Sequence, residues 1–207
     1  MTEFDRRAHW QRVYSSKNET EVSWFEQSPT LSLDLIRRSG AHSTTSIIDI
    51  GGGASRLVDA LLENGYRAVS VLDLSGKALS VARVRLGTHA SHVSWIEADV
   101  TRWEPEQLYD LWHDRAAFHF LTDPDDRRAY VERLTRGTSS GAQVIIGTFA
   151  LDGPSRCSGL PVTRHDSNSL KQALGESFQL EETRPYGHRT PGGAIQRFQF
   201  SRFRKLR

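Results

Sequence analysis

An apolar stretch that breaks into three consecutive glycines constrains the fold of this chain more than any other feature. The stretch is Ile47–Ile50, and the glycines occupy positions 51–53. Because glycines carry no Cβ, the N–H groups of such a turn and the start of the next helix can face an anionic or zwitterionic ligand closely. A second apolar run ends at Asp73, where a carboxylate can accept hydrogen bonds from a ribose diol. Together they indicate a cofactor that contains a nucleoside.

The spacing of the glycines separates two classes of cofactor. Dinucleotide-binding turns follow Gly-x-Gly-x-x-Gly, and counted from Gly51 the third glycine is replaced by Arg56. A flavin or nicotinamide oxidoreductase is therefore disfavoured. The pattern Asp49-x-Gly51-x-Gly53-x-Ser55 instead resembles motif I of the class I S-adenosylmethionine-dependent methyltransferases, with Ser55 in the third glycine position.

Strand and helix patterns alternate along the chain. Strands are expected at 46–50, 69–73, 93–97, 108–112 and 142–149, with helices at 56–64, 75–86 and 124–134 between them. A helix at 4–14 and another opening at Pro29 precede this series, and a helix at 166–175 and strands at 178–183 and 194–203, joined by a turn over 185–193, follow it. Such alternation requires parallel pairing with crossover helices. The pattern and the resemblance predict an α/β, Rossmann-like, doubly wound, mostly parallel seven-stranded sheet with an antiparallel last strand.

Length and charge narrow the function classes. With 207 residues the chain is expected to form one methyltransferase domain, in which residues 1–28 form an N-terminal lid segment and residues 29–207 the catalytic core. The 27 basic and 25 acidic residues nearly cancel, which disfavours nucleic acid as a partner. No apolar run is long enough to span a bilayer, and one cysteine excludes an internal disulfide. We expect a cytoplasmic monomer or weak homodimer without a metal site.

The resemblance implies that S-adenosylmethionine is the cofactor and S-adenosylhomocysteine its product. In that family the acid after the third strand binds the adenine amino group, which here is Asp99, with the N–H of Val100 beside it; the alternative is a turn aspartate. Asp49 either orients the glycine turn or receives the methionine ammonium, and needs a partner in both cases. The full set of expected cofactor contacts is Trp24, Asp49, Gly51, Gly53, Ser55, Asp73, Leu74, Asp99, Val100 and His113.

A polar segment follows the fourth expected strand. Its residues 114–116 are similar to the fourth motif of thiopurine methyltransferase-like small-molecule enzymes, in which an aspartate, an arginine and a small residue follow the strand. Methyl transfer needs a general base only if the nucleophile arrives protonated. The candidate catalytic residues are His113, Asp114, Arg115 and His119. The alternative is that the histidines are packing residues and that Asp114 pairs with Arg115.

Side chains at the N-terminus and in the late loops are the candidate substrate contacts. They are Trp10, Tyr14, Arg156, Cys157, His188, Arg189 and Gln196. The aromatic residues either pack the N-terminus down or fold over the cofactor as a lid, and the arginines either bind an anionic acceptor or are solvated. In related enzymes the loop after the fifth strand and the last hairpin overhang the acceptor pocket.

The expected activity is methyl transfer to a small molecule, because no accessory recognition domain is apparent. The resemblance around Asp114 and Arg115 makes a thiol or other soft nucleophile the first expectation for the acceptor. A protein-lysine methyltransferase and a non-catalytic S-adenosylmethionine-binding module are the alternatives.

Overall fold

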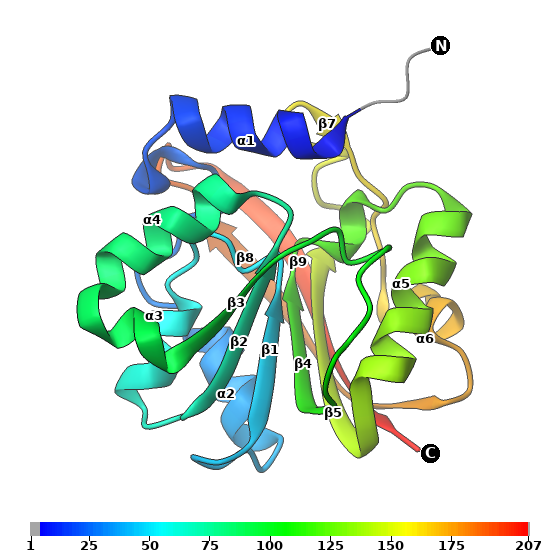
Figure 1. Ribbon diagram of the computed structural model, residues 1–207. Coiled ribbons are helices and arrows are strands. Elements are labelled where there is room, and N and C mark those ends of the chain that lie inside the picture. Colours follow the sequence, from blue (N-terminus) through cyan, green and yellow to red (C-terminus); the bar gives the residue numbers. More distant parts are fainter. Residues whose placement is uncertain (1–4, 207) are drawn as a thin grey trace.

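A seven-stranded sheet runs through the centre of the computed structural model, which describes residues 5–206 (Figure 1). Its strand order is β3-β2-β1-β4-β5-β9-β8. The strands are β1 (Ser46–Ile50), β2 (Ala68–Asp73), β3 (Val93–Glu97), β4 (Tyr109–Arg115), β5 (Thr138–Phe149), β8 (Phe178–Arg189) and β9 (Ile195–Lys205). Neighbours among β1 to β5 pair in parallel, and β9 is antiparallel to both β5 and β8. The predicted fold class is confirmed.

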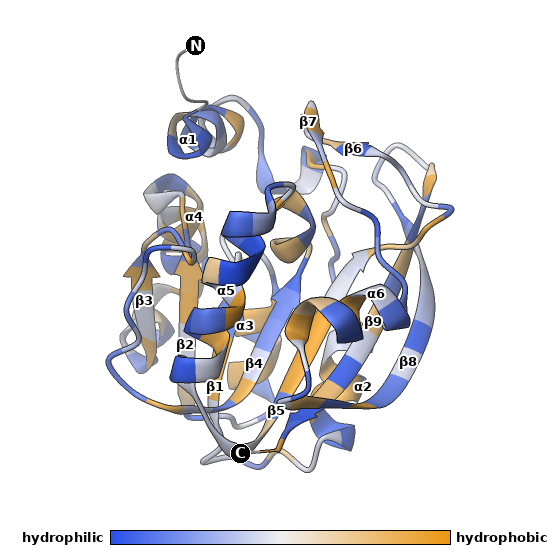
Figure 2. Cartoon of the chain, turned by 90° about the vertical axis from the view of Figure 1, so that its right-hand side faces the viewer, coloured by the Kyte–Doolittle hydropathy of each residue, from blue (hydrophilic) through white to orange (hydrophobic). Residues whose placement is uncertain are grey.

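Helices cover both faces of the sheet. They are α1 (Arg6–Ser16), α2 (Thr30–Arg38), α3 (Leu57–Glu63), α4 (Gly76–Leu86), α5 (Pro124–Gly137) and α6 (Ser167–Leu174), with short 3₁₀ helices η1 (Glu19–Glu21), η2 (Gly87–His92) and η3 (Phe118–Phe120). Helices α2, α3 and α4 pack on one apolar cluster, and α5 and α6 on the other. Figure 2 shows apolar residues concentrated where strands and helices meet. A two-stranded ribbon of β6 (Arg156–Cys157) and β7 (Leu160–Pro161) lies apart from the sheet.

The central strands are buried on both sides, which explains their continuous apolar runs. In β1, Ile47 belongs to the cluster beneath α2, α3 and α4, whereas Ile48 belongs to the cluster beneath α5 and α6. Leu111 and Trp112 of β4 divide in the same way. Because successive side chains of a strand point to opposite faces, a strand between two helix layers needs apolar residues at every position. The polar positions on these strands therefore require partners.

Most element boundaries agree with the sequence to within a few residues. The side chain of Ser75 accepts a hydrogen bond from Ala78 N and caps α4, as predicted. The first helix was expected from Phe4, which lies outside the described residues; α1 begins at Arg6, after the capping residue Asp5, and continues to Ser16.

Several predicted boundaries are wrong. Strand β5 begins at Thr138 and not at residue 142. Strand β4 continues to Arg115, because His113 and Asp114 find hydrogen-bond partners inside the protein and so remain in a buried strand. The last hairpin is also longer than expected, since residues 185–189 continue β8 and pair with β9. Pro185 suggested a loop, but β8 is an edge strand, where a missing N–H is tolerated.

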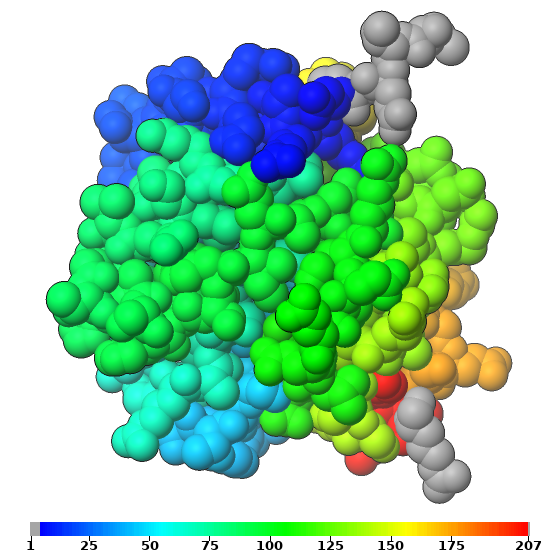
Figure 3. Space-filling model, viewed as in Figure 1, coloured from blue at the N-terminus to red at the C-terminus, as the bar shows by residue number. Residues whose placement is uncertain are grey.

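Helix α1 lies across the end of the sheet at which the parallel strands terminate (Figure 1). In the space-filling view it covers this end of the molecule (Figure 3). Gln11 attaches it to α4, because its Oε1 accepts hydrogen bonds from Ser75 Oγ and Lys77 N, both at 3.2 Å. In residues 5–206, no helix is both long and apolar enough to cross a membrane.

Candidate active site

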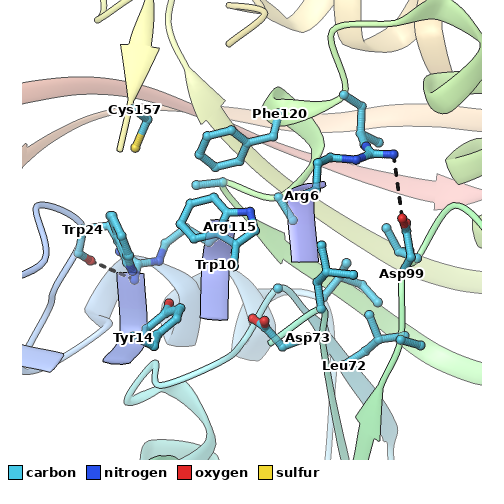
Figure 4. A pocket seen from close by; sticks show the side chains of 18 of the residues that line it. Arg6, Trp10, Tyr14, Trp24, Leu72, Asp73, Asp99, Arg115, Phe120 and Cys157 are labelled. Atoms are coloured by element: carbon cyan, nitrogen blue, oxygen red, sulfur yellow. Dashed lines mark hydrogen bonds and ion pairs between the residues drawn. The ribbon is translucent and has the colours of Figure 1, made fainter. Parts of the chain in front are cut away.

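A cavity lies beneath α1, at the carboxyl ends of β1, β2, β3 and β4 (Figure 4). Open parallel sheets usually bind their ligands at this edge. The cavity is lined by Arg6, Trp10, Tyr14, Trp24, Ile50, Gly51, Leu72, Asp73, Leu74, Ala98, Asp99, Val100, Arg115, Ala116, Ala117, Phe120, Leu121, Phe149, Cys157 and Phe198. Figure 4 shows Leu72, Asp73 and Asp99 on one side, and Trp24, Cys157 and Phe120 on the other. We call the first group the acid side. The aromatic side is the second group together with the lining residues Trp10, Tyr14, Arg115, Phe149 and Phe198.

The glycine turn has no room for side chains. Gly51 and Gly53 have φ values of 66° and 42°, which favour glycine. A Cβ on Gly51 would lie 2.8 Å from Ala117 Cβ, and one on Gly53 would lie 2.7 Å from Asp73 Oδ2. However, the N–H groups of Gly51 and its neighbour both donate to Leu72 O, at 2.8 and 3.3 Å. These two donors therefore fix the turn to β2, and the missing side chains let Ala117 and Asp73 pack against the turn.

Asp73 ends β2 at the floor of the cavity. Its Oδ1 accepts a hydrogen bond from Ser75 N at 2.7 Å, and its Oδ2 lies on the side of Gly53. Burial raises the pKa of Asp73 to about 7; the Ser75 N–H opposes this change, and the charges of Asp49 and Glu97 add to it. One carboxylate oxygen is thus held by the main chain, and the group is poised to ionise near neutral pH.

Asp99 and Val100 follow β3 and line the same side of the cavity. Asp99 Oδ1 accepts hydrogen bonds from the N and Oγ1 atoms of Thr101, at 2.9 and 2.7 Å. Its Oδ2 lies 3.7 Å from Arg6 Nη2 of α1. The turn role and a ligand role are therefore compatible, since they use different oxygens.

Asp49 and His113 form a buried pair behind the glycine turn. His113 Nδ1 donates to Asp49 Oδ1 at 2.7 Å, and His113 Nε2 accepts from Ser32 Oγ at 2.9 Å. Asp49 Oδ2 lies 2.5 Å from the position that a Cβ on Gly52 would occupy. Both ring nitrogens of His113 are used, and neither residue lines the cavity. The required partner of Asp49 is His113, and the pair supports the turn from behind.

Asp114 organises the segment that follows β4. It is fully buried and accepts hydrogen bonds from the N–H groups of Ala117 and Phe118 and from the Tyr130 hydroxyl, at 2.8 to 3.2 Å. Burial raises the pKa of Asp114 to about 6, although these donors favour the carboxylate. The residue does not line the cavity, and it does not pair with Arg115. Its contacts hold the chain where Ala117 reaches the cavity wall.

His119 also lies outside the cavity. It is fully buried; Phe149 N donates to its Nδ1 at 3.4 Å, and among the described residues its Nε2 has no hydrogen-bond partner. Burial, with a contribution from His165, lowers the pKa of His119 to about 3. The imidazole is therefore neutral near pH 7. The structure places it against the ring of Phe149, whose centroid is 4.8 Å from its own.

The remaining predicted residues divide between the cavity and other places. Trp10, Tyr14, Trp24, Gly51, Asp73, Leu74, Asp99, Val100, Arg115 and Cys157 line it. The Ser55 hydroxyl instead accepts from Leu57 N at the start of α3, and Arg156 and Arg189 are exposed and bond to the main chain of Gly159 and Gly193. His188 is buried against Ser23 O, and Gln196 is not among the lining residues. The structure therefore brings together about half of the candidate set.

Sequence reasoning missed several lining residues, most of them apolar. Phe149 ends β5 and Ile50 ends β1, so the rule that ligands bind at the carboxyl ends of strands was enough to find both. Phe198 could not be found in this way, because its place depends on the register of β9 against β5. Arg6 and Phe120 lie in segments whose position only the packing of α1 and η3 determines. In the described part of the chain, no group of three potential metal ligands is present.

Comparisons with known proteins point to one family. A family model described as a methyltransferase domain matches residues 47–141, and this range begins in the apolar stretch before the glycines. Trans-aconitate 2-methyltransferase of Rhizobium etli is 32% identical over 115 residues, which make up 55% of this chain and 42% of that protein. The chain thus spans less than half the length of the curated relatives that it first matches.

Solved structures share the fold. The N-methyltransferase NodS of Bradyrhizobium japonicum, in complex with S-adenosylhomocysteine, has a TM-score of 0.74 at 16% identity, covering 98% of this chain and 100% of that one. A structure described as the conversion of a disulfide bond into a thioacetal group during echinomycin biosynthesis has a TM-score of 0.77 at 21% identity, covering 97% and 93%. At these identities the similarity concerns the fold alone.

Proposed function

Since residues 47–141 carry the methyltransferase domain of the class I S-adenosylmethionine-dependent family, as the glycine pattern predicted, we propose that the chain transfers a methyl group to a small molecule. One observation carries this proposal. The glycine turn, Asp73 and Asp99 come from three different strand ends and line a single cavity that aromatic side chains complete.

The lining residues of the cavity suit the chemistry of the cofactor. The bare backbone at Gly51 admits the methionine portion, Asp73 Oδ2 is available to a ribose diol, and Asp99 Oδ2 with Val100 suits the adenine edge. When bound, S-adenosylmethionine supplies a methyl group on a positive sulfur: an acceptor lone pair bonds to the methyl carbon, and the electrons of the broken bond stay on that sulfur, leaving S-adenosylhomocysteine.

The protein contributes alignment and exclusion of water. Trp10, Tyr14 and Trp24 come from α1 and the segment after it, and they close the cavity from above. His113 and His119 lie outside the cavity, and among the described lining residues the carboxylates are the two assigned to the cofactor.

The proposed class of acceptor nucleophile rests on the lack of a general base among the described side chains of the aromatic side. We propose a thiol or another soft nucleophile, whose proton is lost to solvent before the transfer, because no described side chain on the aromatic side is suited to accept one. A cytoplasmic location, a monomer or weak homodimer, and one domain over residues 1–207 stay predictions.

Calorimetric titration with S-adenosylhomocysteine tests the proposal. We expect micromolar binding by the wild type and a loss of about 2 kcal/mol, roughly 30-fold, in Asp73→Ala. Asp152→Ala is the matched control, since that carboxylate is exposed and pairs with Arg197. No binding by folded wild type would overturn the proposal.

Transfer of labelled methyl groups then separates the alternatives. The panel contains thiols, amines, hydroxyl compounds and a lysine-containing peptide. Transfer to a thiol supports the proposed acceptor class, and transfer to the peptide alone supports a protein-lysine methyltransferase. Binding of S-adenosylhomocysteine without transfer to any panel member supports a non-catalytic binding module.

A further inference from the structure

Two guanidinium groups line the cavity, and both are already paired with carboxylates. The side chain of Arg115 is 11% exposed, and its Nη1 lies 3.0 Å from Oε2 of Glu26, whose side chain is 10% exposed. Nη2 of Arg115 donates to Trp24 O at 3.0 Å (Figure 4). Arg6 pairs with Asp126 at 3.1 Å. Neither guanidinium therefore offers an unmatched charge to an anionic ligand.

Strand β8 holds Glu26 in place. The Tyr186 hydroxyl donates to Glu26 Oε1 at 2.8 Å, and His188 Nδ1 lies 3.3 Å from the same oxygen. His188 Nε2 donates to Ser23 O at 2.7 Å, which fixes the imidazole. Burial by itself would raise the pKa of Glu26, but His188, Arg115 and Tyr186 lower it below its ordinary value. Glu26 is therefore ionised at neutral pH and neutralises Arg115.

The other polar groups around the aromatic side are uncharged. Burial raises the pKa of the Cys157 thiol to about 11, against a smaller opposing contribution from Ser23. Burial also raises the pKa of Tyr14, and the charge of Asp73 adds to this change. Both groups are protonated near pH 7. Among the described lining residues on the aromatic side, Arg115 is the charged one, and the Glu26 carboxylate is paired with it.

Aromatic rings form most of the remaining wall. Trp10 meets Phe120 edge to face with centroids 5.0 Å apart, and Trp24 at 5.8 Å. Phe149 and Phe198 also line the cavity, and their ring centroids are 4.7 Å apart. Such rings favour an apolar body and offer little to a charged group that must give up its hydration.

We propose that the acceptor is a small molecule whose aromatic or other apolar body carries no charged group, and that Glu26 determines this preference by pairing with Arg115. The inference rests on the proposed function, because it concerns the same cavity. A carboxylate against these rings would lose water without gaining an unpaired cation, which is unfavourable. Glu26 is a positioning residue, acting on the acceptor through Arg115.

Two matched probes test the preference for an uncharged acceptor. 4-Methylthioanisole and 4-(methylthio)benzoate share a ring and a methylthio group, and differ by a methyl group in place of a carboxylate. Each is titrated into the protein with and without saturating S-adenosylhomocysteine. We expect the wild type to bind the neutral probe at least about tenfold more tightly. Equal or tighter binding of the carboxylate overturns the inference, as does binding of neither probe.

Variants test the role of Glu26. Glu26→Gln leaves Arg115 with an unmatched charge, so the preference should fall by about tenfold. Arg115→Gln leaves the carboxylate unmatched, so the preference should rise. Glu182→Gln is the matched control on β8, where the carboxylate pairs with exposed Arg38 and Arg184, and should leave the ratio unchanged.

If the ratio of the affinities for the two probes is unchanged in folded Glu26→Gln or Arg115→Gln, the proposed role of Glu26 is overturned. If Glu26→Gln does not fold, comparing the affinity ratio of Arg115→Gln with that of the wild type still tests the role of Glu26. Failure of the wild type to bind S-adenosylhomocysteine counts against the proposed function and not against this inference, because the probes are also titrated without that compound.

Discussion

Asp73 is expected to make the affinity for S-adenosylhomocysteine depend on pH. Burial raises the pKa of this carboxyl group to about 7 in the unliganded protein. Hydrogen bonds from ribose hydroxyls favour the carboxylate, so the pKa falls when the ligand binds. At pH values below the pKa of Asp73 in the unliganded protein, binding therefore releases a proton. The affinity for the ligand consequently rises with pH.

The size of the effect follows from the ionised fraction. With a pKa of about 7, roughly a tenth of Asp73 is ionised at pH 6 and nine tenths at pH 8. If the pKa in the complex lies below about 5, the dissociation constant falls about tenfold between these two pH values, which corresponds to roughly 1.4 kcal/mol. Near pH 7 the uptake of ligand should release about half a proton.

Calorimetry in two buffers of different ionisation enthalpy measures both the affinity and the proton release. Asp73→Asn has nothing to titrate at this position, so its affinity should not change between these pH values. Asp110→Asn is a matched control at the other end of the sheet, where the carboxylate accepts hydrogen bonds from Ser46, and it should keep the wild-type slope. The reasoning is refuted if the wild-type dissociation constant changes by less than twofold between pH 6 and pH 8. It is also refuted if the affinity of Asp73→Asn depends on pH as strongly as that of the wild type.

Three further perturbations follow from the contacts. His113→Leu leaves the buried Asp49 carboxylate without its partner and should lower the free energy of unfolding in urea by about 3 kcal/mol, whereas His92→Leu, at an exposed position, should change it by less than about 0.5 kcal/mol. A loss below about 1 kcal/mol in His113→Leu contradicts the pairing. Gly53→Ala should weaken binding of S-adenosylhomocysteine at least about tenfold, and Gly141→Ala, also at positive φ but with nothing near its Cβ, should not; equal constants argue against the packed turn. Iodoacetamide should alkylate Cys157 at pH 8 at least about 100-fold more slowly in the folded than in the urea-unfolded protein, and similar rates would refute its burial.

The order of the elements could be predicted because each signal is local. Glycine at positive φ, the cap at Ser75 and the apolar runs of the parallel strands all report the conformation of a few neighbouring residues. The glycine pattern also located the turn, and Asp73 was placed by its position at the end of a strand. The resemblance to the methyltransferase family placed Asp99. Gly51, Asp73 and Asp99 line the cavity, at the strand ends that the sequence predicted.

The direction of each polar side chain was decided by tertiary structure alone. The sequence predicts that His113 and Asp114 follow a strand, but strand pairing continues through both residues. His113 therefore lies behind the glycine turn, and Asp114 contacts Tyr130. Arg115 reaches the cavity, but Glu26 neutralises it from a segment far away in the chain. Whether a charge is free to meet a ligand depends on partners that packing supplies, and residue spacing carries no information about them.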